Sequence, residues 1–290
     1  MKNLRYSAFD VFLIIFLAIL GSIIAYPFIY TISISISDPS EVVRQKVLLF
    51  PHGFDLKAYE QVLRSPRIWI AYKNTVLYTI VGTVFRVILL VMTAYPLSRK
   101  KFTGRNIFMF IIAFTMLFSG GLIPTFLVVR GLGLVNTIWA MVLPGALTAY
   151  YVIITRTFFQ NTIPASVEES AMLDGANDMQ ILWRIVVPVS TPIIVVMGLF
   201  IAVGIWNNFF QPLLYLNDKK LMPLTILLRD IVVRATGDEF TRRPGMAILD
   251  IPTQSIQAAT LIISMITIMA VYPFIQKYFV KGIMIGAIKE

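Results

Sequence analysis

The sequence contains no cysteine and little charge. The absence of cysteine from its 290 residues excludes disulfides, thiol catalysis and thiolate metal sites. The single histidine, His52, lies between Pro51 and Gly53, which indicates a turn, and no histidine pair exists for metal binding. Charged residues make up 14% of the chain, against roughly 25% in an average soluble domain, whereas apolar residues make up 58%. The composition therefore indicates an integral membrane protein and offers no residue set for an enzyme.

Six apolar runs are long enough to cross a bilayer, which takes about 20 residues. None contains Asp or Glu, which counts against a proton relay or ion-driven transport. A phosphate-binding loop of the form G-x-x-x-x-G-K-[ST] is also absent, so uphill transport needs nucleotide hydrolysis by another chain. The six runs are Val11–Ile36, Thr75–Leu97, Ile107–Val129, Ile138–Phe158, Ile193–Leu216 and Ala258–Ile275.

The net charge of +10 comes mostly from residues that flank the runs, which indicates membrane topology rather than nucleic-acid binding. With six crossings, the basic flanks share one side of the membrane. Short cytoplasmic loops are rich in Lys and Arg, so both termini are expected in the cytoplasm. We therefore expect an all-α membrane protein with six transmembrane helices. Its expected parts are an N-terminal helix with an outer loop (1–72), a core (73–281) and a cytoplasmic tail (282–290).

One basic residue, Arg86, lies in the middle of the second apolar run. From that depth its side chain reaches the aqueous interface poorly, so it is expected to face protein or a water-filled cavity. Pairing with other protein groups is favoured over contact with a substrate.

A long patterned segment, residues 160–188, separates the fourth and fifth runs. Pro164 disfavours helical geometry at Ile163, and Ser166-Val167-Glu168-Glu169 has the capping-box pattern. These signals predict a short helix from about Val167 to Leu173, which Gly175 ends because it accepts positive φ at little cost. Asn177 or Asp178 is expected to cap a second helix, from Met179 to Val187, which Pro188 interrupts.

The first of these helices combines a small apolar face with an acidic edge. Val167, Ala171 and Met172 form the face, and Ala171 and Ala176 are small enough for a partner to approach closely. Helices that lie on lipid favour Lys and Arg on the polar face, so docking to a cytoplasmic partner is favoured over lipid contact. The acidic edge comprises Glu168, Glu169 and Asp174.

The segment Glu169-Ser170-Ala171, three residues, Gly175, nine residues and Ile185-x-Val187-Pro188 resembles the EAA loop of bacterial ABC importer permeases. That pattern is E-A-A, three residues, G, nine residues, I-x-L-P, from which Ser170 and Val187 are mild departures. AYKNTVLYTIVGT at 71–83 and the closing YPFIQKYFVKGIMIGAIKE resemble the second permease subunit of maltose-type carbohydrate importers. Within the type I importer permease fold, the sequence is most similar to the branch for complex oligosaccharides, including uronates from alginate or pectin.

The resemblance implies a permease that pairs with a second, homologous permease subunit in the bacterial cytoplasmic membrane. Two ATPase subunits, which hold ATP and Mg, would dock below, and an extracytoplasmic binding protein would deliver the sugar. This chain itself would hold no cofactor and no metal. A stand-alone secondary transporter of a small polar solute is the alternative. The residues that the resemblance assigns to ATPase coupling are Glu168, Glu169, Ser170, Ala171, Asp174, Gly175, Ala176, Ile185 and Pro188.

Amides and aromatic rings in the fifth run suit a sugar path. Asn207 and Gln211 are four residues apart, on one face of a helix, and Phe210 lies on the same side. We expect this face, with Trp206, to line the translocation path, although amides also bond neighbouring helices and aromatic rings also mark the membrane interface.

Two further segments, one outer loop and the C-terminal tail, carry expectations. In the outer loop 217–254, Arg242 and Arg243 are expected to meet an acidic rim of the binding protein or an acidic sugar, unless the loop is simply solvated. The tail 282–290 either reaches the ATPase subunits, as the resemblance implies, or frays.

Overall fold

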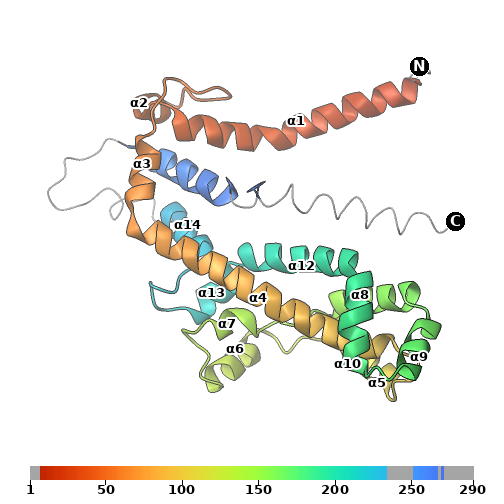
Figure 1. Cartoon of the computed structure of the whole chain (residues 1–290). Helices are drawn as coiled ribbons and strands as arrows, with labels where there is room; N and C mark the ends of the chain where they lie inside the picture. Colours follow the sequence, from red (N-terminus) through yellow and green to blue (C-terminus); the bar gives the residue numbers. More distant parts are fainter. Residues whose placement is uncertain (1–6, 234–250, 267–268, 271–290) are drawn as a thin grey trace. The chain divides into compact units, whose positions relative to one another are not determined.

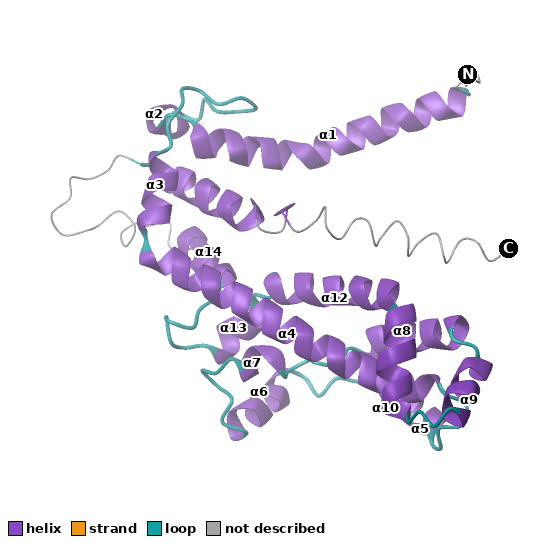
Figure 2. Ribbon diagram, viewed as in Figure 1, coloured by secondary structure: helices purple, strands orange, loops and turns teal. Residues whose placement is uncertain are grey.

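The computed structural model describes residues 7–233, 251–266 and 269–270. Within these residues the chain forms helices and loops and no strand, which confirms the all-α expectation (Figure 2). The described residues divide into two compact units: one holds 7–69, 227–233 and 251–266, and the other holds 70–226 and 269–270. Figure 1 labels the elements of both.

The first unit contains a long apolar helix and the loop that folds over its end. Helix α1 (Ala8–Ile36) begins with a capping box between Ser7 and Asp10, and most of its apolar side chains are exposed. After α1 the loop turns back, so that Asp38 N donates to the His52 carbonyl at 2.9 Å. The unit also contains α2 (Pro39–Val43), α3 (Lys57–Arg64) and the helix Thr253–Ile266.

The second unit is built along α4 (Pro66–Ser98), a helix of 33 residues that enters it at Ile70. Buried side chains of α4, α8 and η1, such as Leu90, Phe159 and Val186, form two apolar clusters. The remaining elements are α5 (Arg105–Leu117), α6 (Leu122–Gly131), α7 (Trp139–Val142), α8 (Ala149–Thr162), α9 (Ala165–Leu173), α10 (Asp178–Ile181), the π-helical turn η1 (Leu182–Val186), α11 (Val187–Val189), α12 (Thr191–Trp206) and α13 (Phe210–Tyr215). Helix α14 (Leu224–Val233) begins in this unit and belongs to the first unit from Leu227 on.

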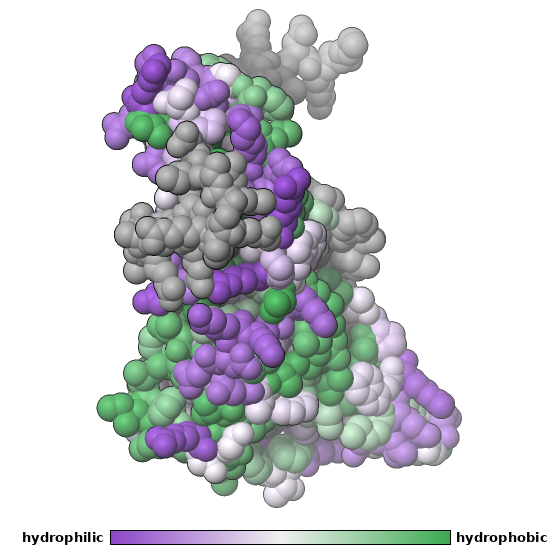
Figure 3. All heavy atoms as spheres, turned by 90° about the vertical axis from the view of Figure 1, so that its left-hand side faces the viewer, coloured by the Kyte–Doolittle hydropathy of each residue, from purple (hydrophilic) through white to green (hydrophobic). Residues whose placement is uncertain are grey.

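Apolar side chains cover much of the surface, as expected for helices in lipid. They form broad green areas on the lower half of the face in Figure 3. Among the described residues, α1 and α4 are each long and apolar enough to span a membrane. Two bent pairs also qualify if each counts as one span, α5 with α6 and α10–α11 with α12.

Three of the expected spans are not continuous helices, a feature that the length of the apolar runs did not predict. α5 and α6 meet at 116° where Gly121 adopts φ +82°, and the run Ile193–Leu216 is interrupted after Trp206, between α12 and α13. The run Ile138–Phe158 is interrupted between α7 and α8, where Pro144 lacks an N–H and Gly145 has φ +69°. Backbone breaks at membrane depth persist only where protein groups satisfy the freed carbonyls.

Candidate functional site

Helix α9 and the turn that follows it are fixed by backbone hydrogen bonds. The Gly175 N–H donates to the Met172 carbonyl at 3.0 Å, and the Ala176 N–H donates to the Ala171 carbonyl at 2.9 Å. This pair of bonds is the Schellman arrangement, and Gly175 has φ +82° as it requires. The predicted glycine stop is confirmed.

The predicted start of α9 was wrong. The helix begins at Ala165 with Pro164 as its N-cap, and no side chain caps it. Ser166 therefore lies in the first helical turn and is not the cap of a capping box. The reason is that proline fixes φ near the helical value and ends the preceding helix itself, so no polar cap is needed. The second helix does carry a capping box, between Asn177 and Gln180. Asn177, one of the two residues predicted to cap this helix, is its N-cap.

Two ion pairs join α9 to the loop after α4. The Arg99 guanidinium pairs with the Glu168 carboxylate, and both side chains are mostly buried, at 15% and 10% exposure. Lys101 Nζ lies 3.2 Å from Glu169 Oε1, and both of these side chains are exposed. Burial raises the pKa of Glu168, while the neighbouring Arg99 charge opposes the rise. The Glu168 side chain therefore lies between α9 and the loop after α4, and not on the acidic edge that the sequence predicted.

Several residues that the resemblance assigned to coupling face the protein's own core. Ala171, Ala176 and Ile185 pack against the cluster that contains Phe159 and Ile181, and the small size of the two alanines lets α9 and its turn approach this core closely. At the base of this packing, Arg156 Nε and Gln160 Nε2 of α8 donate to the last carbonyls of α4, at 2.9 and 3.2 Å. α4, α8 and α9 are thus tied together at one end.

The outer surface of α9 is exposed and partly apolar. Leu173 is 90% exposed, and Met172 and Val167 are 44% and 41% exposed. Leu173, which the sequence reasoning did not single out, is the most exposed large apolar residue of this helix; its position directly before the glycine turn was the available signal. The other assigned residues that lie exposed are Glu169, Ser170, Asp174, Gly175 and Pro188.

The polar patch of the fifth run lies at a break between α12 and α13. Pro212 has no N–H to bond the Asn208 carbonyl four residues earlier, and that carbonyl accepts the Thr225 hydroxyl at 3.0 Å instead. Asn207 ends α12 and is exposed, so it does not share a helix face with Gln211 as predicted. The sequence reasoning missed Asn208, for which Pro212 was the signal.

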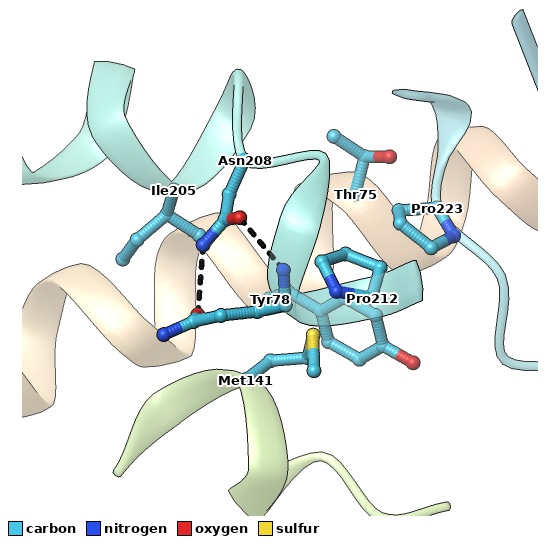
Figure 4. A pocket seen from close by; sticks show the side chains of 8 residues that line it. Thr75, Tyr78, Met141, Ile205, Asn208, Pro212 and Pro223 are labelled. Carbon is cyan, nitrogen blue, oxygen red and sulfur yellow. Dashed lines mark hydrogen bonds between the residues drawn. The ribbon is translucent and has the colours of Figure 1, made fainter. Parts of the chain in front are cut away.

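Both amides of the break are committed to protein partners. Asn208 Nδ2 donates to Gln211 Oε1 at 2.7 Å, and the Gln211 N–H donates to Asn208 Oδ1 at 3.1 Å (Figure 4). Gln211 Nε2 donates to the Pro144 carbonyl at 3.0 Å. With Tyr78 and Met141 these residues line a cavity of about 10 Å³, room for roughly one water molecule. In this conformation the patch joins helices, and no sugar would fit there.

The aromatic residues of the patch point to other surroundings. Trp206 packs edge-on against Tyr72 of α4, with ring centroids 6.2 Å apart. Phe210 is 50% exposed. Neither side chain lines the small cavity.

Arg86 binds the carbonyls that the break after α7 leaves open. Its Nε donates to the Val142 carbonyl at 3.1 Å, and its Nη2 donates to those of Met141 and Pro144, both at 3.0 Å. A helix end leaves its last four carbonyls without helical partners, and in a membrane no water replaces them. The expected pairing of Arg86 with protein is confirmed. Arg242, Arg243 and the tail 282–290 lie outside the described residues.

A comparison with protein families identifies the chain. The family described as "Binding-protein-dependent transport system inner membrane component" matches residues 87–285. The chain belongs to this family. The permease is 42% identical over 289 residues to the polygalacturonan/rhamnogalacturonan transport system permease protein YtcP of Bacillus subtilis, with 100% of both chains covered. It is 26% identical over 280 residues to the arabinooligosaccharides transport system permease protein AraQ of Halalkalibacterium halodurans, with 94% of each covered.

A solved structure has the same fold as the chain. The permease is similar to a chain from the crystal structure of a bacterial ABC transporter involved in the import of the acidic polysaccharide alginate, with a TM-score of 0.86 and 35% identity over 94% of this chain and 99% of that one. The type I importer permease fold expected from the sequence is therefore confirmed. The permease is a multi-pass inner-membrane component of a binding-protein-dependent transport system.

Proposed function

We propose that the permease imports acidic oligosaccharides as one of two homologous permease subunits, with two separate ATPase subunits below and a binding protein above. Full-length similarity to a polygalacturonan/rhamnogalacturonan permease supports the substrate class, as does the likeness to a chain of an alginate importer. The absence of a phosphate-binding loop from the sequence supports hydrolysis of ATP by other chains.

Helix α9 is the proposed contact with the ATPase. Its exposed Leu173, Met172 and Val167 offer an apolar surface that this chain leaves uncovered, and Glu169 and Asp174 border it. An uncovered apolar surface on a rigid element is typical of a protein contact. The exposure of Leu173 is the observation that favours a partner over an internal role for this helix.

The internal contacts give α9 a stiff connection to the membrane helices. The pair Arg99–Glu168 ties α9 to the end of α4, and Arg86 lies twelve residues away along that helix, about 18 Å at 1.5 Å per residue. Closure of the ATPase subunits would then move α9 and α4 as one body. A nearly complete switch between two states needs about 5.5 kcal/mol of differential binding. A flexible connection between α9 and α4 would transmit only part of that free energy to the membrane helices.

A matched pair of substitutions at Gly175 tests this proposal in the reconstituted importer. Open space surrounds its Cβ position, so only the backbone conformation, φ +82°, is at stake. Gly175→Asn keeps that conformation accessible, whereas Gly175→Val strongly disfavours it. We expect both variants to insert into the membrane, and the Val variant to lose roughly tenfold or more of ATP-driven uptake, a barrier change of about 1.4 kcal/mol, and to retain less ATPase on purification. Normal uptake by the Val variant would contradict a coupling role for this turn.

A further inference from the structure

Arg86 is a positive charge at membrane depth, and among the described residues no carboxylate forms an ion pair with it. The sequence has no Asp or Glu between Glu60 and Glu168, and none between Asp178 and Asp218. Arg86 donates to three acceptors, the carbonyl oxygens of Met141, Val142 and Pro144, which carry no net charge. The guanidinium is therefore held in place as a cation by dipoles alone.

The charge lies next to the polar centre of the second unit. The Pro144 carbonyl accepts from Arg86 Nη2 and from Gln211 Nε2, each at 3.0 Å, so one oxygen joins the two interrupted spans. Met141, another acceptor for Arg86, lines the cavity beside Asn208 and Gln211. Buried charges are costly in a membrane, and a neutral amide such as Gln could donate to two of these three carbonyls without that cost. The use of arginine at this position calls for a role for its charge.

We infer that Arg86 gives the translocation path a preference for anionic oligosaccharides by its electrostatic field, without direct contact with the sugar. The inference rests on the proposed function and adds to it a residue that determines specificity. A fixed cation surrounded by apolar helices acts over a longer range than one in water, because the effective dielectric constant is closer to 20 than to 80. For a sugar that passes with its charge about 8 Å from the guanidinium, an effective dielectric constant of 20 favours a singly charged anion over its neutral analogue by roughly tenfold or more.

A purely structural role makes a different prediction. If Arg86 only satisfied open carbonyls, its loss would slow the transport of charged and neutral sugars alike. If its field selects the substrate, its loss changes the ratio of the two rates. An oligogalacturonate and its methyl ester form a suitable pair, because esterification removes the charge and keeps the chain length.

The test measures ATP-driven uptake of both sugars by the complete importer in proteoliposomes. The binding protein is the same for every variant, so a change in the ratio of uptake rates arises in the permease. Arg86→Gln keeps a donor for the carbonyls and removes the charge, whereas Arg86→Lys keeps the charge. Arg130→Gln, at the exposed end of α6, is the matched control for the loss of an arginine.

We expect Arg86→Gln to lower the ratio of acidic to neutral uptake by roughly tenfold, with Arg86→Lys and Arg130→Gln within about twofold of wild type. Gln211→Glu is a second test, because it places a carboxylate beside the same Pro144 oxygen and leaves Arg86 intact. Its negative charge opposes the field of Arg86, so we expect the ratio of acidic to neutral uptake to fall here as well. An unchanged ratio in Gln211→Glu, or in an assembled Arg86→Gln, would overturn the inference alone. No ATP-dependent uptake by the wild-type importer would overturn the proposed function, and the inference with it.

Discussion

The buried pair between Glu168 and Arg99 provides the sharpest test of how α9 is held. Removing one partner of a buried ion pair costs about 3–5 kcal/mol, because the other charge is left uncompensated. Arg99 Nε and Nη2 are buried and have no hydrogen-bond partner among the described residues, and the guanidinium lies 4.8 Å from the centre of the Tyr95 ring. The ring recovers about 1 kcal/mol of the loss, so Glu168→Leu should cost about 3 kcal/mol.

The two single substitutions should not cost the same. Arg99 cannot lose its proton, so Glu168→Leu leaves a permanent buried cation. Glu168 can take up a proton when Arg99→Met removes its partner, which limits that cost to about 1–2 kcal/mol. The double variant removes both charges and should lie within about 1 kcal/mol of wild type. The coupling energy between the two sites should therefore be about 3–5 kcal/mol.

Amide hydrogen exchange of the α9 peptide, measured by mass spectrometry on the permease in nanodiscs without ATPase, reports the local opening of this helix. A loss of about 3 kcal/mol raises the exchange rate of its protected amides roughly 150-fold. Glu169→Leu is the matched control one residue away, because its pair with Lys101 is 56% and 76% exposed and contributes at most about 1 kcal/mol. Equal exchange in Glu168→Leu and Glu169→Leu would refute the view that the buried pair holds α9.

The remaining predictions concern pH and the outer loop. Because burial raises the pKa of Glu168 above its unfolded value, the folded state binds that proton more tightly, so the contribution of the Glu168 carboxyl to stability falls as pH rises through the raised pKa. Wild type should thus gain stability relative to Glu168→Gln on mild acidification, and a relative loss in α9 exchange protection would contradict this sign. Asn136 has φ +59°, and its Oδ1 accepts the N–H groups of Asn217 and Asp218 at 2.6 and 3.2 Å. Asn136→Gly should cost about 1 kcal/mol and Asn136→Val about 2–3 kcal/mol, measured by exchange at 216–221; equal losses would show that the backbone conformation is unimportant.

The sequence predicted the elements whose causes lie within a few residues. The glycine stop at Gly175 and the cap at Asn177 depend on neighbours at most five positions away. Apolar run length likewise predicted α1 and α4, because a membrane span needs only enough consecutive apolar residues. The family resemblance rested on the spacing around Gly175 and was confirmed by the match over residues 87–285.

The sequence did not predict where the spans break. Proline at 144 or 212 is compatible with a kinked but continuous membrane helix, because neighbouring helices can satisfy the freed carbonyls. Whether they do so by ending the helix depends on side chains that packing brings near. Arg86 reaches the Pro144 carbonyl from 58 residues away, and Thr225 reaches that of Asn208 from 17 residues away.

The sequence alone determined that the chain is an all-α membrane permease with no phosphate-binding loop of the form G-x-x-x-x-G-K-[ST], because hydropathy, charge placement and short-range turn chemistry act along the chain. Only the tertiary structure decided that Glu168 is buried beneath α9, that Gln211 is bonded to Pro144, and that Arg86 holds the end of a broken helix. Hydropathy records which residues avoid water, and lipid and protein satisfy that condition equally well. The choice of partner for a polar group depends on distances that arise only when distant helices pack together.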